Sequence, residues 1–495
     1  MPHIRRIAFF LLALIPFSSA QEHDHGIPEK LGSVSFPVSC DPAVQRQFNR
    51  GVALLHSFAY AAAENAFQQV AQQDPHCAMA HWGAAMAYFQ PLWDPPIPPE
   101  TLSNAQREIH QATQIKPRTE RERQFIDALA LVYQDAATVP YPVRASHYEQ
   151  AMAALSAANK SDLEAQVFYA LALLANLSPS DKTHAKQKQA VAILEPLDRA
   201  YPDHPGIPHY LIHACDNAEL ASQGLPAARA YSQIAPSAPH ALHMPSHIFT
   251  RLGLWDDSIA SNLAARQAAL QQHDSGEQLH AMDYLVYAYL QTGRDKDVAQ
   301  VIRQLKDIPG LNPGDFKMSY ASTAMPIRYM VERNKWAEAA NVTPSEGTPA
   351  QVAAIAVWAR AEGLARTGHT TEAQAEIQEL QLIEKQLRAS DENYWSTQVE
   401  ILEQEVMAWL AQANNKPEEA TTLMYAAADQ EDAIEKLPVT PGPILPAREQ
   451  LGYLLLQQDH PTQALKEFQT SLANAPGRLA SLKGAEQATQ LSARN

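Results

Sequence analysis

The sequence predicts an all-α protein made of stacked antiparallel helix pairs. Apolar residues recur at helical spacing along most of the 495 residues, and no stretch shows the apolar–polar alternation of a half-buried strand. The composition agrees, because 46% hydrophobic and 19% charged residues suit a folded chain that is long enough for several cores. A third observation, one spacing of residues that occurs near both ends, predicts how the helices stack.

That spacing is a glycine followed by alanine, phenylalanine and proline after 12, 4 and 8 residues. The two sets are Gly51, Ala63, Phe67 and Pro75, and Gly452, Ala464, Phe468 and Pro476. The small residues let two helices approach closely, the aromatic ring fills the space between units, and the proline ends the second helix. The spacing resembles that of the tetratricopeptide repeat (TPR), whose unit is 34 residues long.

This resemblance implies a right-handed TPR-like solenoid of antiparallel helix pairs over residues 41–490. It also implies that the first helix of each pair lines a concave groove, which in TPR proteins holds peptides or partner proteins. Repeats rich in histidine occupy residues 205–294, and a regular terminal repeat occupies residues 445–478. The strings HYLIHA and HALHMPSHIF are similar to segments of exported bacterial TPR proteins, which implies a shared fold and site but no particular reaction.

The start of the chain is expected to lie outside the solenoid. Residues 1–20 have the pattern of a signal peptide, with two arginines, a short apolar core and small residues before a cleavage site after Ala20. Residues 21–40 lack periodicity and are rich in Gly, Pro, Ser and charged residues, which predicts a flexible leader. We therefore expect a periplasmic or secreted protein.

Charge and motif content exclude several classes of function. A net charge of −16 without a basic stripe argues against nucleic-acid binding, and no stretch after the signal peptide is apolar enough for membrane insertion. The sequence lacks a glycine-rich phosphate loop, an HExxH zinc motif and a Cys-x-x-Cys pair. Among the three cysteines, Cys40, Cys77 and Cys215, one disulfide at most can form, and Cys40 with Cys77 is the candidate pair.

Residues 205–294 carry polar side chains three, four and seven residues apart, which places them on one face of each of three expected helices. The stripes are His209, His213 and Asp216; His240, His243 and His247; and His280, Asp283 and Tyr287. His243 follows His209 by 34 residues, one repeat length, and His247 follows His213 by the same interval. We therefore expect these four rings to form one patch across neighbouring helices, with His213 beside His247.

Pro245 interrupts the middle stripe, because a proline inside a helix costs about 3 kcal/mol or bends the helix. Either the helix bends there, or it begins at Pro245 and leaves His243 in the preceding loop. Eight other histidines are expected on the surface: His56, His110, His147, His184, His204, His273, His369 and His460.

Two functions fit this pattern. In the first, the stripes hold a transition metal ion, Zn, Fe or Cu, which imidazole and carboxylate ligands suit. The ligands would be His209, His213, His243 and His247, with His240 or His280 completing the set. Asp216 and Asp283 would bind the ion, orient the rings or act as general base, and metal-bound water would support a metal-dependent hydrolase. In the second, the groove binds a peptide, a protein or a small molecule without a metal, and the histidines donate hydrogen bonds.

Overall fold

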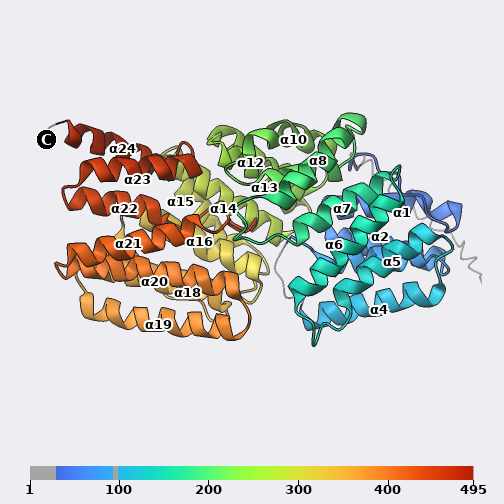
Figure 1. Cartoon of the computed structure of the whole chain (residues 1–495), viewed down its shortest axis with the longest axis horizontal. Helices are drawn as coiled ribbons and strands as arrows, with labels where there is room; N and C mark the ends of the chain where they lie inside the picture. Colours follow the sequence, from blue (N-terminus) through green and yellow to red (C-terminus); the bar gives the residue numbers. More distant parts are fainter. Residues whose placement is uncertain (1–28, 93–97, 494–495) are drawn as a thin grey trace, which may run out of the picture.

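The computed structural model describes residues 29–92 and 98–493 of the chain. None of these residues lies in a β-strand, and the helices stack as antiparallel pairs (Figure 1). The predicted fold class, an all-α TPR-like solenoid, is confirmed. Within the same ranges, no helix is long and apolar enough to span a membrane. The predicted signal peptide, residues 1–20, lies outside the described residues.

The N-terminal helices form one end of the elongated molecule (Figure 1). They are η1 (Pro42–Val44), α1 (Gln45–His56), α2 (Tyr60–Gln73), α3 (Ala78–Phe89), α4 (Pro99–Ile115), α5 (Glu120–Tyr133), α6 (Tyr141–Ala158), α7 (Leu163–Ala175) and α8 (Ala185–Ala200). The central helices follow. They are α9 (Gly206–Cys215), α10 (Ala221–Ile234), α11 (Pro239–His243), α12 (Pro245–Arg251), α13 (Trp255–Gln271), α14 (Ser275–Gln291), α15 (Asp295–Gln304) and η2 (Leu305–Asp307).

The C-terminal helices form the opposite end (Figure 1). They are α16 (Phe316–Glu332), α17 (Trp336–Ala339), α18 (Ala350–Arg366), α19 (Thr370–Ala389), α20 (Asn393–Ala413), α21 (Pro417–Asp432), α22 (Ala447–Gln457), α23 (Pro461–Asn474) and α24 (Leu479–Ser492). The turn between α23 and α24 contacts the central helices, because the Trp255 indole N–H donates to the Gly477 carbonyl at 3.1 Å.

The repeated spacing has the same physical role at both ends. On α2, the buried Phe67 ring lies between Gly51 of α1 and Gly83 of α3, and a Cβ on either glycine would lie within 3 Å of the ring. The other end repeats this arrangement. There the ring is Phe468 of α23 and the glycines are Gly452 of α22 and Gly484 of α24. Each glycine therefore makes room for an aromatic ring on the helix between two units.

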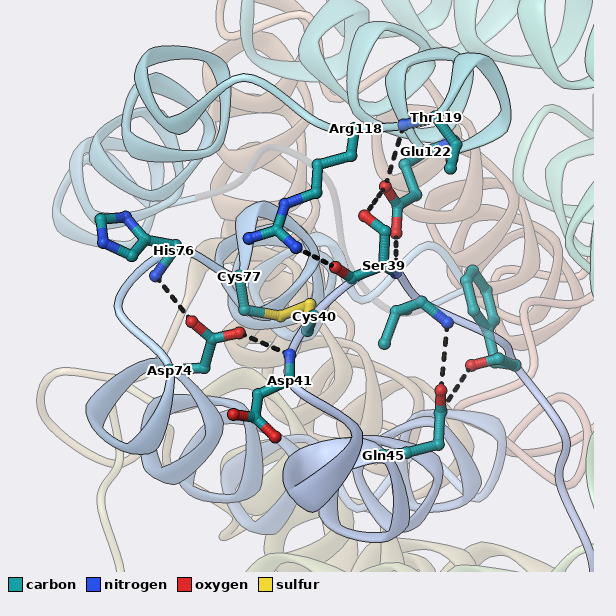
Figure 2. The surroundings of a disulfide bond; sticks show 12 residues. Ser39, Cys40, Asp41, Gln45, Asp74, His76, Cys77, Arg118, Thr119 and Glu122 are labelled. Carbon is teal, nitrogen blue, oxygen red and sulfur yellow. Dashed lines mark hydrogen bonds between the residues drawn. A yellow bond between two sulfur atoms is a disulfide. The ribbon is translucent and has the colours of Figure 1, made fainter.

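The described part of the segment expected to be a flexible leader, residues 29–40, is packed against the solenoid instead. Phe36 is completely buried, and its ring centroid lies 5.4 Å from that of Trp82 and 5.0 Å from that of Phe125. The predicted disulfide between Cys40 and Cys77 is present, beside a Ser39 side chain that donates to Glu122 at 2.6 Å (Figure 2). Residues 29–40 contribute Phe36 to an aromatic core, so their low periodicity did not indicate a flexible segment.

The proline-rich break before the last repeat crosses from one end of the molecule to the other. We name residues 435–443 the crossing segment. Its Glu435 N–H donates to the Pro179 carbonyl at 2.8 Å, close to α8. Its Thr440 carbonyl accepts from the Tyr284 hydroxyl of α14 at 3.2 Å, and its Pro443 carbonyl accepts from the Arg328 guanidinium of α16 at 2.5 Å. The crossing segment thus ties the two ends to the central helices.

Candidate metal centre

The structure brings all six predicted histidines together. His209 and His213 lie on α9, His240 and His243 on α11, His247 on α12 and His280 on α14. Their ring nitrogens form two groups, within each of which the ligand atoms lie within 4.8 Å of one another. The first triad is His209, His213 and His240, and the second triad is His243, His247 and His280.

The helix break at Pro245 does not separate the rings of His243 and His247. Helix α11 ends at His243, and α12 begins at Pro245, which occupies a position in the first turn where its missing N–H costs nothing. Met244 between them keeps right-handed helical dihedrals, φ −53° and ψ −36°. His243 and His247 therefore remain one turn apart on one face, although the backbone is divided into two short helices.

The grouping of the rings differs from the expected four-histidine patch. The rings of His213 and His247 are neighbours, with centroids 6.0 Å apart. The closer contacts, however, run along each helix, with 3.1 Å between the Nε2 atoms of His209 and His213 and 3.0 Å between those of His243 and His247. Repeat spacing correctly indicated that α9 and α12 are neighbours, whereas the third ring of each triad comes from a helix further along the chain, α11 for the first triad and α14 for the second.

Hydrogen bonds at Nδ1 assign the tautomers of three rings. His209 Nδ1 donates to the His56 carbonyl at 2.5 Å, an oxygen that can only accept. His243 Nδ1 donates to Asn262 Oδ1 at 2.6 Å; the Asn262 amide nitrogen donates to a backbone carbonyl, which identifies Oδ1 as the acceptor. His247 Nδ1 donates to Asp216 Oδ2 at 2.9 Å. In each neutral ring, Nε2 is then left with a lone pair.

Two such lone pairs face each other in the second triad. The Nε2 atoms of His243 and His247 lie 3.0 Å apart, and neither neutral ring has a proton to place between them. Burial lowers the pKa of His243 well below its usual range and that of His247 to about 4, so a shared proton is disfavoured at neutral pH. This arrangement suits a cation that both nitrogens can bind.

Asp216 supports the centre from outside. Its carboxylate accepts from His247, from Lys436 Nζ at 2.7 Å and from Arg251 Nε at 2.8 Å. These cations hold the pKa of Asp216 well below its usual range against the opposing effect of burial. Burial in turn lowers the pKa of Lys436 to about 8. Asp216 is therefore a charged acceptor that orients His247, and it belongs to neither triad.

Asp283 is not brought to the histidine rings in this way. Its carboxylate lies 4.0 Å from the Arg328 guanidinium, and burial raises its pKa to about 6. The structure instead adds two side chains that we did not predict: Asn262, which holds His243, and Glu277, whose carboxylate accepts from His240 Nδ1 at 3.3 Å. Glu277 precedes His280 by three residues on α14, so helical spacing contained a signal for it, whereas Asn262 belongs to a helix outside the stripes.

The histidines do not line an open groove. Five of the six are at most 3% exposed, and only His213 is half-buried. Phe58, Leu92 and Pro438 of the crossing segment close over the rings. A cavity of about 370 Å³ reaches His213, Asp216 and Lys436 from outside, and its walls include Tyr141, Trp395 and Leu437. Ligands can therefore approach the centre from the His213 side.

Three other histidines are buried, contrary to expectation. His56 and His204 donate from Nε2 to the two oxygens of Glu164, at 2.9 and 3.1 Å. Both histidines lower the pKa of Glu164, to about 2, although its burial acts in the opposite direction. His184 lies between Glu219 and Glu435, at 2.8 and 3.2 Å. These rings are buried because each has an acidic partner from a distant helix or from the crossing segment, which local sequence spacing does not reveal.

Comparisons with known proteins concern the overall fold. No protein-family model and no curated protein matches the chain. The TPR domain of P58(IPK) is 13% identical, covers 91% of this chain and 99% of its own, and has a TM-score of 0.23. Yeast Tom70 is 10% identical with coverages of 90% and 88% and a TM-score of 0.33. A human IFIT1 dimer with m7Gppp-AAAA is 10% identical with coverages of 80% and 89% and a TM-score of 0.36.

Proposed function

We propose that this protein binds a transition metal ion at the histidine centre, through Nε2 atoms of the two triads. The observation that carries the proposal is the pair of facing Nε2 atoms of His243 and His247, 3.0 Å apart, whose Nδ1 atoms are both engaged as donors. Two nitrogens bound to one ion at about 2.0–2.1 Å would lie about 3 Å apart. The rings therefore already have the separation that a shared ion requires.

The surroundings of the rings support this proposal. Metal-bound histidines usually donate their second N–H to a carboxylate or a carbonyl, which fixes the ring and increases its basicity. Here Asp216 accepts from His247, Glu277 from His240 and the His56 carbonyl from His209. Imidazole donors suit Zn, Cu or Fe better than the hard ions Mg and Ca, and copper binds such sites most strongly among the divalent first-row ions.

The cavity at His213 extends the proposal to catalysis. A catalytic zinc site has three protein ligands and an open position for water or substrate, and each triad offers three rings. Bound metal would supply a water molecule of lowered pKa, which is the nucleophile of metal-dependent hydrolases. The chain itself would contribute the cavity, which places a small molecule or a peptide end beside His213 and Asp216. A metal-dependent hydrolase is the enzyme class that this arrangement fits best.

We also propose that the protein is exported to the periplasm or secreted. The N-terminal signal pattern motivates it, and the disulfide between Cys40 and Cys77 supports it, because structural disulfides persist in oxidising compartments such as the periplasm. The alternative function, a peptide-binding or protein-binding scaffold without metal, would use the cavity of about 370 Å³ rather than a histidine-lined groove, since the histidines are covered.

Metal analysis tests the proposal. The mature protein would be purified from the periplasm without a polyhistidine tag, and its zinc, copper and iron content measured by mass spectrometry. Calorimetric titration with Zn²⁺ and Cu²⁺ should then show binding to the parent protein. In the variants His243→Ala and His247→Ala, the site that these two rings form should bind more than about 100-fold more weakly, since each variant removes a direct ligand of that site.

The matched control for this test is His369→Ala, because His369 is an exposed histidine outside the centre. Its affinity should equal that of the parent. The proposal fails if the parent binds neither ion, or if all three variants bind as the parent does. The cavity beside His213 should in that case be tested with peptides.

A further inference from the structure

We infer that the centre holds two late transition metal ions, such as Zn²⁺ or Cu²⁺, one in each histidine triad. This inference rests on the metal binding proposed above and adds its stoichiometry and its geometry. Within each triad, the closest Nε2 atoms are 3.1 and 3.0 Å apart. The ring centroids do not divide the triads, because His213 and His247 of different triads are 6.0 Å apart while His213 and His240 of the first triad are 6.5 Å apart. The division rests on the ligand atoms, which lie within 4.8 Å of one another inside each triad.

One ion cannot satisfy this arrangement as well as two. Ligands bound to one ion at about 2.0–2.1 Å lie at most about 4.2 Å from one another, and zinc in proteins is almost always four-coordinate. The ligand atoms divide into two sets of three, and the structure assigns His240 and His243 to different sets although they are neighbours on α11. Side chains three residues apart lie on one helix face, so α11 would contribute one ligand to each ion.

The two triads have parallel supports, which is the strongest sign of two equivalent sites. Each contains a histidine pair one helical turn apart, His209 with His213 and His243 with His247. Each contains one ring held by a neutral oxygen. Those oxygens are the His56 carbonyl for His209 and Asn262 Oδ1 for His243.

The parallel extends to the charged groups. Each triad contains one ring that donates to a carboxylate, which itself accepts from a lysine. In the first triad, Glu277 accepts from His240 and from Lys317 Nζ at 2.8 Å. In the second triad, Asp216 accepts from His247 and from Lys436 Nζ at 2.7 Å. The supports match in kind but not in position, because the carboxylate holds the third ring, His240, in the first triad and a member of the helical pair, His247, in the second. Partners of both kinds orient metal-binding rings in known sites.

Adjacent triads have a chemical consequence. Two ions in these triads would supply the Lewis-acid chemistry of two-metal sites, and the histidines of α9, α11, α12 and α14 would hold them. Such pairs stabilise the attacking and the leaving oxygen of a displacement together. The first triad contains His213, the ring that reaches the cavity, so a substrate would meet this ion first.

Loading experiments on the mature protein test the inference. The protein would be incubated with excess Zn²⁺ or Cu²⁺ and freed of unbound metal by gel filtration, and bound metal would be measured by mass spectrometry. The parent and the control His369→Ala should retain two equivalents. His240→Ala and His280→Ala, which each remove one ligand of one triad, should retain one equivalent, and the double variant should retain none.

The outcomes separate the two claims. A parent that retains one equivalent, which either single variant abolishes, overturns the two-ion inference and leaves the proposed metal binding intact. A parent that retains none overturns both. Circular dichroism and thermal melts of each variant check the fold, and the conservative variants His240→Gln and His280→Gln replace the alanine variants if either of those fails to fold.

Electron paramagnetic resonance adds a test of adjacency. The His280→Ala variant with one equivalent of Cu²⁺ should give the spectrum of an isolated ion. The parent with two equivalents should give a signal that is broadened or lost through coupling of two neighbouring ions. Two equivalents with the full spectrum of isolated ions would contradict the assignment of one ion to each of these adjacent triads.

Discussion

The terminal repeats and the central helices stack in the same way but use different chemistry at their contacts. At both ends, an aromatic ring fills the space that two glycines leave on neighbouring helices, as Phe67 does between Gly51 and Gly83. In the centre, the close approach is made by Gly224 of α10 against Cys215 and Ile248. The inner faces of α9, α11, α12 and α14 carry histidines there.

This difference shows how a helical repeat acquires a site. A few small and aromatic residues suffice to fix the stacking, and the other inward positions can then carry polar groups. Those groups must find partners, because a buried polar atom without one costs about 1–3 kcal/mol. The centre meets this requirement with partners outside the stripes, including the His56 carbonyl, Asn262 and Lys436. The ends contribute stability by packing, whereas the centre contains the buried polar groups on which the proposed metal site depends.

The largest expected effect lies at the ends. Phe67→Ala should lower the free energy of unfolding by about 3–5 kcal/mol, since it empties the fully buried space between two glycines. Denaturant unfolding measures this loss, and Leu382→Ala, at a side chain that is 61% exposed, should change the free energy by less than about 0.5 kcal/mol. Metal stoichiometry should stay unchanged in Phe67→Ala. A loss of metal would show that the ends and the centre are not separable.

The second largest expected effect is the stabilisation of the folded protein by a metal ion bound at the histidine centre. Zinc at 1,000 times its dissociation constant should stabilise the parent by about 4 kcal/mol, because the ion binds only the folded state. Thermal melts with zinc and with a chelator measure this difference. It should become smaller in His247→Ala, which removes one ligand of the second triad and leaves the first triad intact, and persist unchanged in His369→Ala. Equal melting temperatures with zinc and chelator in the parent would contradict a folded-state metal site.

A smaller effect, on zinc affinity, is expected from a substitution of Asp216, which accepts a hydrogen bond from His247 of the second triad. Asp216→Asn keeps the shape of the side chain but removes the charge that His247 donates to, so zinc affinity should fall about 10–100-fold. Calorimetry measures the change. Asp127→Asn, at an exposed side chain on α5, is the matched control and should bind zinc as the parent does. An unchanged affinity in Asp216→Asn would mean that the ring is oriented by other contacts.

The smallest expected effect is on the pH dependence of folding stability, which should have opposite signs in the centre and in the C-terminal helices. Burial raises the pKa of Glu362 to about 7 and that of Glu431 to about 8, from 4.5. The folded state then holds more protons than the unfolded state between these values, so stability falls as pH rises through that range. Burial lowers the pKa of His247 from 6.5 to about 4, so the metal-free centre loses stability as pH falls from 6.5 towards 4.

Melting temperatures of the metal-free protein from pH 4 to pH 9 check these opposite slopes. Glu362→Gln should remove the decrease that Glu362 causes between pH 4.5 and about 7, because glutamine cannot ionise. His247→Gln should flatten the decrease below pH 6.5. If either variant keeps the slope of the parent, the buried group that it replaces does not contribute to the pH dependence of stability.

Local sequence spacing determined the fold class and the helix faces. Helical periodicity and the Gly–Ala–Phe–Pro spacing depend on neighbours within one or two helices, so they predicted the stacked pairs and the contact of Phe67 with Gly51. The same local geometry placed His209 with His213, because residues four apart share a helix face in any structure. The interval of 34 residues also indicated that His213 and His247 lie on neighbouring helices.

Only the tertiary structure decided what those faces meet. The third rings come from α11 and α14, which are not the next helices along the chain. Lys436 reaches Asp216 across 220 residues of sequence, and Phe58 and Pro438 cover a face that we expected to line a groove. These contacts depend on how distant helices and the crossing segment pack, and no residue spacing encodes that packing. The burial of His56 and His204 on Glu164 has the same cause, since their partner lies on another helix.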